Sequence, residues 1–347
     1  MTQRFVVGLV GVGRIGAMHA QNLVELKELF AERGIELELR ITDVAREHAL
    51  KICEQVQARY IPSAAELFVQ GLDACIITTG TATHEELIRQ AVAHGVPVFC
   101  EKPLTLDSES SAQLVDDLAD SGARVQLGFQ RRFDPGYLEA RRRFRGGELG
   151  WLHTVRSITA DQFPPPVEFL ARSGGLFRDC AVHDFDILRW LTGREVIEVY
   201  ACGSNNGDPA IGAVGDVDSG VALLTFDDGL TATVHVTRYN GAGHDVRLEL
   251  QGSRASVMVG LDDSYATASA EPGYTRTAHP HETFMERFDR AYRQELVAFI
   301  EFALGARENP CTPAEALAAA LIADAAQESL ETGQAVRVGQ QPVVKRD

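Results

Sequence analysis

The sequence predicts an α/β protein in two parts: an N-terminal doubly wound parallel sheet and a C-terminal α+β domain with a large, open, mostly antiparallel sheet. Three observations favour this fold class. Short apolar runs alternate with helical stretches as far as Phe129, a glycine-rich loop follows the first run, and strand-like runs follow one another closely beyond Val196. We expect the domains to span residues 1–130 and 131–340.

In the first part, five short runs are predicted to form the strands of one sheet. The stretches between them place apolar residues three and four positions apart, as helices that cover a sheet do. Strands joined through helices pair in parallel, which gives a doubly wound sheet. The predicted strands are Phe5–Val10, Leu37–Thr42, Ala74–Thr79, Val96–Cys100 and Arg124–Leu127, and the predicted helices include Ile15–Leu29, His84–Ala93 and Ser108–Asp120.

Beyond Gln130 the pattern changes to that of an α+β domain. The run Pro164-Pro165-Pro166 excludes regular helix and central strand, because proline lacks the amide donor. Asp227-Asp228-Gly229 is typical of a hairpin turn between antiparallel strands. The predicted helices are Pro135–Arg145, Phe177–Leu191, Phe288–Ala303 and Pro313–Thr332, and the predicted strands are Trp151–Ile158, Val196–Cys202, Ser219–Phe226, Thr231–Arg238, Asp245–Gln251 and Ala255–Val259.

Composition limits the partners of the chain. Its 347 residues carry a formal net charge of -16, which disfavours nucleic acid and anionic membranes as partners. No apolar stretch is long enough to span a membrane, and Met1 leads directly into an apolar run without a signal-peptide pattern, so we expect a cytoplasmic protein. The cysteines show neither a C-x-x-C pair nor zinc-like spacing, so we expect no metal. A neutral small molecule fits this composition best.

The segment Gly11-Val12-Gly13-Arg14-Ile15-Gly16 matches G-x-G-x-x-G between a predicted strand and a predicted helix. Gly11 permits the tight turn, Gly13 lets the backbone approach a pyrophosphate, and Gly16 allows the helix to pack closely on the strand. The N–H groups at the start of the helix, around Arg14 and Ile15, favour an anion. This placement predicts dinucleotide binding, and a glycine-rich turn without a ligand is the alternative.

Asp43 ends the second predicted strand, where a carboxylate can accept hydrogen bonds from the adenine-side ribose. This placement favours NAD as the cofactor. Arg46 lies close by in the sequence, so NADP stays open as a second cofactor. The alternative interpretation of Asp43 is that it caps a helix beginning at Val44.

Two further loops follow predicted strands at the carboxyl edge of the sheet, where open parallel sheets bind ligands. In the first loop, Thr79 and His84 are candidates for the cofactor site, although His84 can instead simply start the next helix. The second loop is Glu101-Lys102-Pro103, and we place Glu101 and Lys102 at the cofactor. A lone lysine is usually a solvated surface residue, but the position beside the predicted cleft favours a functional Lys102.

Together these motifs resemble the Gfo/Idh/MocA oxidoreductases over almost the whole chain. The glycine loop, Glu101-Lys102-Pro103 and Gly174-Gly175-Leu176-Phe177-Arg178-Asp179-Cys180-Ala181-Val182-His183-Asp184 carry the resemblance. Within that family the chain is most similar to the inositol 2-dehydrogenase group, to judge from residues 128–134 and 183–186. The resemblance implies a Rossmann domain followed by an α/β domain with a large open sheet. It also matches Lys102, Asp179 and His183 to the family's catalytic residues.

These residue types suit the oxidation of a secondary alcohol. A hydride leaves carbon for the nicotinamide while a proton leaves oxygen, and His183 can accept that proton near neutral pH. Asp179 precedes it by four residues, so on a helix it shares a face with His183 and can orient the ring or bind a hydroxyl. Lys102, from the other domain, would stabilise the developing alkoxide. Alone, an Asp and a His at this spacing are more often a surface pair. Asp184 and Asp186 also suggest a metal cluster with His183, but no further ligand set is evident.

Three more residues are predicted to contact the substrate. Tyr239 lies where the inositol dehydrogenases that this chain resembles place a tyrosine, although packing is nearly as good an interpretation. Arg131 can line the pocket, or it can pair with Asp134. Asp161 lies within Thr159–Phe163, where the family's inositol enzymes often carry a further histidine. This departure leaves the identity of the substrate open.

The leading hypothesis is NAD-dependent oxidation of a secondary ring hydroxyl of a cyclic polyol, with myo-inositol as the expected substrate. A sugar or glycoside dehydrogenase would use the same residues. The alternatives of another class are an NAD-assisted glycoside hydrolase and a non-catalytic NAD-binding regulator. An open antiparallel sheet leaves a face that a second subunit could cover, so we expect a homodimer or homotetramer.

Overall fold

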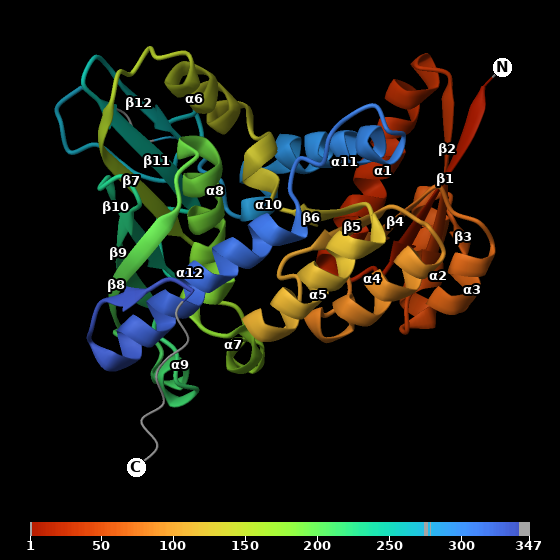
Figure 1. Ribbon diagram of the computed structural model, residues 1–347, viewed down its shortest axis with the longest axis horizontal. Helices are drawn as coiled ribbons and strands as arrows, with labels where there is room; N and C mark the ends of the chain where they lie inside the picture. The colour runs from red at the N-terminus through yellow and green to blue at the C-terminus, as the bar shows by residue number, and fades with distance from the viewer. Residues whose placement is uncertain (1, 274–276, 278, 340–347) are drawn as a thin grey trace. The chain divides into compact units, whose positions relative to one another are not determined.

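In a computed structural model of the chain, which describes residues 2–273, 277 and 279–339, the polypeptide divides into two compact units (Figure 1). The first consists of Met1–Phe133 with Arg290–Leu317, and the second of Asp134–Asp289 with Ala318–Asp347. The expected domain boundary between residues 130 and 131 stays a prediction. The expected end of the second domain, residue 340, lies outside the described residues.

The first unit contains a six-stranded parallel sheet in the order β3-β2-β1-β4-β5-β6. The chain winds outward on one side of β1 and then returns to add β4 on its other side. Ligands bind outside the carboxyl ends of the strands at such a reversal. This sheet confirms the predicted doubly wound fold. Its strands are β1 (Gln3–Val10), β2 (Ile35–Thr42), β3 (Arg59–Tyr60), β4 (Ala74–Ile77), β5 (Val98–Glu101) and β6 (Val125–Gly128).

Helices follow the strands of the first sheet in sequence, as the alternation of residue patterns predicts. Buried leucines and a phenylalanine of the first helix, Leu23, Leu26 and Phe30, join the strand residues in one core. The helices are α1 (Arg14–Glu32), α2 (Arg46–Val56), α3 (Ala64–Val69), α4 (His84–Ala93) and α5 (Ser108–Ser121), with short 3-10 turns η1 (Thr81–Thr83) and η2 (Gln130–Phe133).

A helix from near the C-terminus completes the first unit. Helix α11 (Asp289–Ala303) lies beside α1, although most of the chain separates them in sequence (Figure 1). Its residues Leu296, Val297 and Phe299 belong to the same buried cluster as the strands, and the Phe299 ring lies 5.7 Å from that of Phe99. The sequence predicts this helix within residues 131–340, and the structure adds that it packs in the core of the first unit.

The second unit contains a seven-stranded sheet in the order β12-β11-β7-β10-β9-β8-β13. Only β7 and β10 pair in parallel; the other neighbouring strands pair antiparallel, as expected. Buried and exposed residues alternate along β9 and β10, so one face packs on a core. The strands are β7 (Leu152–Ala160), β8 (Val196–Ser204), β9 (Ser219–Phe226), β10 (Thr231–Thr237), β11 (Asp245–Gly252), β12 (Ser256–Val259) and β13 (Val336–Arg337).

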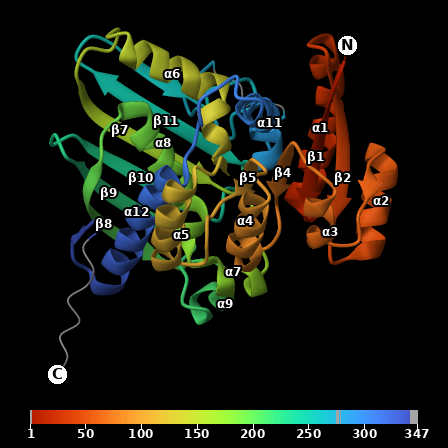
Figure 2. The same cartoon turned by 45° about the vertical axis from the view of Figure 1, so that its right-hand side comes forward.

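Helices cover the buried face of this second sheet, and α8 lies beside β7 (Figure 2). The run Pro164-Pro165-Pro166 leads into α7, and Pro166 is the N-cap residue of that helix. The segment predicted as one helix over Phe177–Leu191 differs from the prediction, because it begins with a π-helical turn, η3 (Phe177–Ala181), before α8 (Val182–Thr192). The other helices are α6 (Pro135–Arg145), α7 (Val167–Ser173), α9 (Pro209–Ala213), α10 (Phe284–Arg287) and α12 (Pro313–Thr332).

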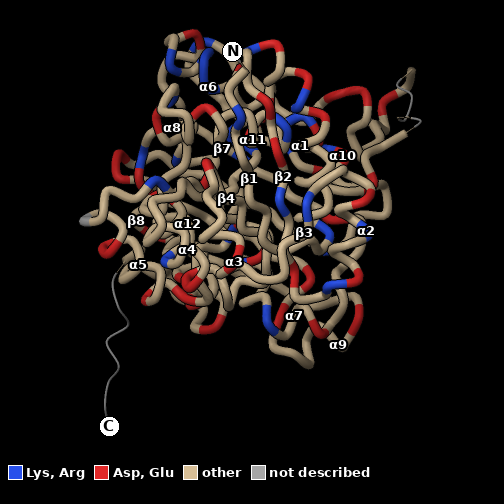
Figure 3. The backbone as a smooth tube through the Cα atoms, turned by 90° about the vertical axis from the view of Figure 1, so that its right-hand side faces the viewer, with Lys and Arg blue, Asp and Glu red and all other residues tan. Residues whose placement is uncertain are grey.

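Charged residues of both signs are interspersed along the backbone (Figure 3). Of the helices that the structure describes, none combines the length and the apolar character that a membrane crossing requires.

Candidate active site

The three glycines between β1 and α1 have three different surroundings. Gly11 has a φ of 91°, and a Cβ there would lie 2.8 Å from Cγ2 of Thr79. A Cβ at Gly16 would overlap the carbonyl oxygen of Gly11 and lie 2.6 Å from Oγ1 of Thr78. A Cβ at Gly13 would meet nothing within 4 Å. Two glycines therefore allow protein to pack on protein, whereas Gly13 leaves open space, as the approach of a pyrophosphate requires.

Gly13 is also the N-cap residue of α1, and Arg14 and Ile15 are the first two residues of that helix. The N–H groups of a helix's first turn have no partner within the helix, so they can bind an anion. The side chain of Arg14 is exposed and that of Ile15 is half-buried. The loop thus presents a helix N-terminus, an arginine and an unobstructed glycine.

Asp43 is tied to this loop. One carboxylate oxygen accepts a hydrogen bond from the backbone N–H of Val12 at 2.7 Å, and the other accepts one from that of Ala45 at 2.7 Å. Helix α2 begins at Arg46 with Ala45 as its N-cap, so the alternative that Asp43 caps a helix from Val44 is wrong. Each carboxylate oxygen has a second lone pair, so Asp43 retains capacity for the hydroxyls of a ribose.

The loop after β4 is held by His84, which is 1% exposed and is the first residue of α4. Its Nε2 lies 3.1 Å from the carbonyl oxygen of Thr79, and its Nδ1 lies 2.8 Å from that of Pro103. The ring therefore links the loop after β4 to the loop after β5. This geometry favours a role in holding two cofactor loops together over direct contact with the cofactor.

At the end of β5, the Glu101 carboxylate turns back toward α1. Its Oε1 lies 2.8 Å from Nε2 of His19, a fully buried residue whose ring packs edge-on against Phe99. Lys102 follows, half-buried, with a cis peptide bond to Pro103. Glu101 thereby fixes the strand end from which Lys102 extends.

Arg131 is 3% exposed and belongs to a buried charged cluster of the first unit. Burial raises the pKa of Tyr292 well above its ordinary value; the charges of Glu101 and Glu295 act in the same direction, and that of Arg131 opposes them. The carboxylate of Asp134 accepts from Arg287 at 2.8 Å and from the first N–H groups of α6. Asp134 thus serves the fold of the second unit, and the role of Arg131 toward a substrate stays a prediction.

In the second unit, Asp179 lies on the π-helical turn and His183 on the first turn of α8. The sequence predicts that both residues lie on one regular α-helix, and this prediction is wrong, because the π-helical turn precedes α8. Single π-helical turns occur often at functional sites because they change the direction in which side chains project. Asp179 is 17% exposed at its side chain, and His183 is also partly buried.

Asp179 is held by Arg238, a residue that sequence reasoning did not select. The Arg238 guanidinium is fully buried, and it donates to Asp179 at 3.1 Å and to Asp216 at 2.8 Å. Burial alone would lower the pKa of Arg238, but the charges around it raise that pKa, so it stays a cation beside Asp179. A buried cation with two carboxylates fixes the position of both.

Asp161 lies beside the same cluster. Its Oδ1 is 3.1 Å from Nδ1 of His244, and its Oδ2 accepts a weak hydrogen bond from the Cys180 thiol at 3.7 Å. Burial opposes ionisation of Asp161, but His244 and Arg238 outweigh it and lower the carboxyl pKa below its ordinary value. The structure therefore brings Asp161 and Asp179 together through Cys180, whose Sγ is also 3.8 Å from Asp179.

Tyr239 follows Arg238 and is 37% exposed. Its ring lies over Gly207, where a Cβ would come within 2.5 Å of Cε2 of the tyrosine. The backbone N–H of Gly207 donates to Asp218, which fixes the loop beneath the ring. The tyrosine thus packs on one side and stays accessible on the other, and its contact with a substrate stays a prediction.

Asp184 is a structural residue. It is fully buried, and it accepts hydrogen bonds from the hydroxyls of Ser157 at 2.6 Å and Thr159 at 2.9 Å, both on β7. Asp184 therefore ties α8 to β7. Across the part of the chain that the structure describes, no three His, Cys, Asp or Glu side chains gather as metal ligands would.

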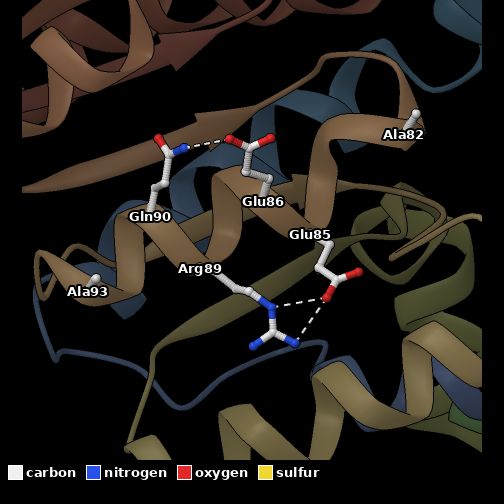
Figure 4. Close-up of a pocket in the computed structure, with 6 residues that line it drawn as sticks. All are labelled: Ala82, Glu85, Glu86, Arg89, Gln90 and Ala93. Carbon is white, nitrogen blue, oxygen red and sulfur yellow. Dashed lines mark hydrogen bonds and ion pairs between the residues drawn. The ribbon is translucent and has the colours of Figure 1, made fainter.

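An open hollow on the outer side of α4 is unrelated to these residues. Figure 4 shows that Arg89 pairs with Glu85 and that Gln90 bonds to Glu86 along this helix. The hollow is lined by Ala82, Glu85, Glu86, Arg89, Gln90 and Ala93, none of which is a predicted site residue. Its polar side chains pair along the helix, Glu85 with Arg89 and Glu86 with Gln90.

Comparison with known families covers both units. A family model described as the NAD-binding Rossmann fold of an oxidoreductase family matches residues 5–129, and the model for the C-terminal α/β domain of that family matches residues 141–338. The chain belongs to the Gfo/Idh/MocA family. It is accordingly an NAD-dependent oxidoreductase acting on CH–OH groups, with the nucleotide-binding part where the glycine loop predicts it.

Several members of the Gfo/Idh/MocA family are similar along their full length. A myo-inositol dehydrogenase of Streptomyces leeuwenhoekii is 36% identical over 88% of this chain and 90% of its own, and a scyllo-inositol 2-dehydrogenase (NAD(+)) of Bacillus subtilis is 34% identical over 95% of each. The solved structure of a scyllo-inositol dehydrogenase from Lactobacillus casei, with bound NAD(H) and scyllo-inositol, has a TM-score of 0.87 at 27% identity over 97% of this chain and 100% of its own.

Sequence reasoning did not select Arg238 and His244 of this chain, although the sequence pattern could have identified both. Arg238 continues the buried alternation of Ala232, Val234 and Val236 beyond the end of β10. His244 precedes β11 in phase with that strand's own buried residues, Val246, Leu248 and Leu250. A polar residue in phase with a strand's buried face predicts a buried partner, because an unpaired group would be costly there.

Proposed function

We propose that the chain oxidises a secondary hydroxyl of a cyclic polyol, with myo-inositol as the expected substrate and NAD as hydride acceptor. The observation that carries the proposal is the full-length similarity to the Lactobacillus casei structure that holds both NAD(H) and scyllo-inositol. The open space at Gly13 and the carboxylate of Asp43 beside the loop suit an NAD molecule. Bound NAD supplies the electrophilic carbon that takes the hydride.

The residues of the chain would handle the proton and the charge. In this proposal His183 accepts the hydroxyl proton as general base, because imidazole ionises near neutral pH. Asp179, held in place by Arg238, accepts a hydrogen bond from a neighbouring hydroxyl and favours the imidazolium that forms. The Lys102 ammonium stabilises the oxygen as it loses its proton.

A panel of inositols, monosaccharides and glucosides, each with NAD and with NADP, tests the proposal through reduced-cofactor absorbance at alkaline pH. Oxidation of an inositol supports it, and preference for a monosaccharide or glucoside supports the sugar dehydrogenase alternative, which the altered segment Thr159–Gln162 favours. Release of a free sugar without net reduction would identify the NAD-assisted hydrolase. If no compound reacts, the dehydrogenase proposal is refuted and the non-catalytic NAD-binding regulator becomes the best interpretation.

Two substitutions separate the roles of the residues. His183→Ala is expected to lower kcat at least a hundredfold while NADH still binds, because general base catalysis contributes about 10²–10⁴ in rate. Near-normal turnover would remove His183 as the base. Asp43→Ser is expected to weaken NAD more than NADP, since it removes the acceptor for ribose hydroxyls. If the preference for NAD over NADP is unchanged, the role of Asp43 is only to hold the backbone of Val12.

The outer face of the second sheet supports the expected homodimer or homotetramer. Tyr200, Val221 and Leu223 on β8 and β9 are large apolar residues that are 38% to 45% exposed. An apolar patch on a sheet is commonly covered by a second subunit. Light scattering on the eluting protein would give the mass directly, and a monomer at micromolar concentration would refute the expectation. Location in the cytoplasm stays a prediction.

A further inference from the structure

We infer that Asp161 and Asp179 form a pair of acceptors for two neighbouring hydroxyls of the substrate ring, and that His244 positions Asp161 for this role. The inference rests on the proposed function and narrows the substrate class to compounds with a vicinal diol next to the oxidised carbon. His244 is a positioning residue in this scheme, because it acts through Asp161.

The sheet register places the participants in one row. Ala160 at the end of β7 pairs with Thr237 at the end of β10 and with Asp245 at the start of β11. Asp161 is the next residue after Ala160, Arg238 the next after Thr237, and His244 the residue before Asp245. The backbone N–H of Asp161 donates to the carbonyl oxygen of Thr237 at 3.0 Å, which continues the row by one residue. Three adjacent strands therefore deliver three polar side chains to the same end of the sheet.

The charges in this row are layered by burial. The cationic Arg238 is fully buried and the imidazole of His244 is 4% exposed. Arg238 also holds Asp216, which is buried, but the two proposed acceptors are more accessible, 17% at Asp179 and 28% at Asp161. This layering leaves acceptors where a ligand can reach them, with their charge balanced from behind.

The spacing of the two carboxylates suits a diol. Both Oδ2 atoms contact Sγ of Cys180, at 3.7 Å for Asp161 and 3.8 Å for Asp179, so they can be no farther apart than the sum of these distances. Two adjacent hydroxyls, each donating over about 2.7 Å, span a gap of this size. A carboxylate accepts several hydrogen bonds, so it can bind a hydroxyl while it contacts a buried partner.

His244 contacts Asp161 in a way that fixes its orientation. The backbone N–H of His244 donates to the carbonyl oxygen of His281 at 2.7 Å, which holds the residue in place. Its ring packs edge-on against Phe284, with Nδ1 on Oδ1 of Asp161. Oδ2 is thereby turned toward Cys180 and Asp179. This histidine directly precedes β11, whereas the family's inositol enzymes often carry one in the segment after β7.

Kinetics on matched substrates test the inference. We would compare the best inositol of the panel with the deoxyinositol that lacks the hydroxyl beside the oxidised carbon. In the unaltered enzyme the deoxy compound should have a tenfold to hundredfold higher KM. His244→Leu should raise KM for the inositol by a similar factor, leave the deoxy compound nearly unaffected and change kcat less than threefold. His244→Asn should restore most of the discrimination, because its amide N–H can replace Nδ1.

The chain offers a matched control in His281, which pairs with Asp262 at the same 3.1 Å distance in the same unit. His281→Leu should leave the discrimination unchanged. If His244→Leu fails to fold, Asp161→Asn tests the same point with little change of shape and should also lose the discrimination. The inference is overturned if folded His244→Leu or Asp161→Asn discriminates as the unaltered enzyme does.

Calorimetry on the NADH-saturated enzyme separates this inference from the proposed function, because it measures binding without turnover. Tighter binding of the inositol than of the deoxyinositol, lost in His244→Leu, supports the acceptor pair even if no oxidation occurs. Oxidation without that preference supports the proposed function and refutes the pair. Failure to bind either compound refutes the pair as well.

Discussion

Gly13 and Gly16 belong to one loop, yet the structure predicts opposite defects when each is replaced by alanine. At Gly13 a methyl group meets no protein atom within 4 Å, so Gly13→Ala should fold. Alanine is a poorer N-cap than glycine, which costs about 1 kcal/mol of unfolding free energy. The methyl group instead occupies the space that a pyrophosphate needs. Loss of one hydrogen bond to a charged group, about 1.5–3 kcal/mol, weakens NADH about tenfold to a hundredfold.

At Gly16 the methyl group would overlap the Gly11 carbonyl oxygen and crowd Oγ1 of Thr78, which itself donates to that carbonyl at 2.7 Å. Neither atom can move without breaking the turn, so overpacking costs about 3 kcal/mol. The better helix propensity of alanine returns about 1 kcal/mol. The net loss of about 2 kcal/mol lowers Tm by roughly 4–8 °C for a unit of this size.

The assay pairs NADH fluorescence titration with urea and thermal unfolding followed by far-UV circular dichroism. Gly13→Ala should lose more affinity than stability, and Gly16→Ala should lose more stability than Gly13→Ala. The reasoning is refuted if Gly13→Ala binds NADH normally, or if the two variants unfold alike.

Three other predictions follow from contacts of the second unit. Because its folded pKa is lowered, ionised Asp161 stabilises the protein above its unfolded pKa of about 4, and this stability is lost as pH falls through the folded pKa. Between pH 6 and 3, the free energy of unfolding in urea should therefore fall more steeply with decreasing pH for the unaltered protein than for Asp161→Asn. Arg238→Met leaves Asp216 buried without its cation and should cost about 3–5 kcal/mol, whereas Arg156→Met, at an exposed ion pair, should cost less than about 1 kcal/mol. Asp184→Ala strips the acceptor from two buried strand hydroxyls and should cost about 1–3 kcal/mol, and an unaltered urea midpoint would refute this.

The local sequence pattern was sufficient to predict most strands, because each strand is a short run of apolar residues bounded by turn residues. The hairpin at Asp227-Asp228-Gly229 is one case: Gly229 adopts a φ of 86° between β9 and β10, as the predicted turn requires. The doubly wound sheet and the glycine loop were likewise predictable, since a strand, a turn and a helix meet there in a fixed order.

Properties that depend on distant partners were not predictable. The amphipathic pattern of α11 shows that it has a buried face but not which core that face joins. The π-helical turn under Asp179 has no sequence period of its own. The alternation along β10 predicts that Arg238 is buried, but it does not identify Asp179 and Asp216 as its partners, because both lie far from Arg238 in sequence.

The return of α11 has a consequence for how the protein is made. During translation, the six strands of the first sheet are synthesised long before Leu296 and Phe299, which fill the core beside Phe99. Until then the nascent nucleotide-binding half carries an uncovered apolar face, a hazard that grows with the delay. A fragment ending at residue 133 should therefore be prone to aggregation. Adding residues 290–317 as a separate peptide should rescue it.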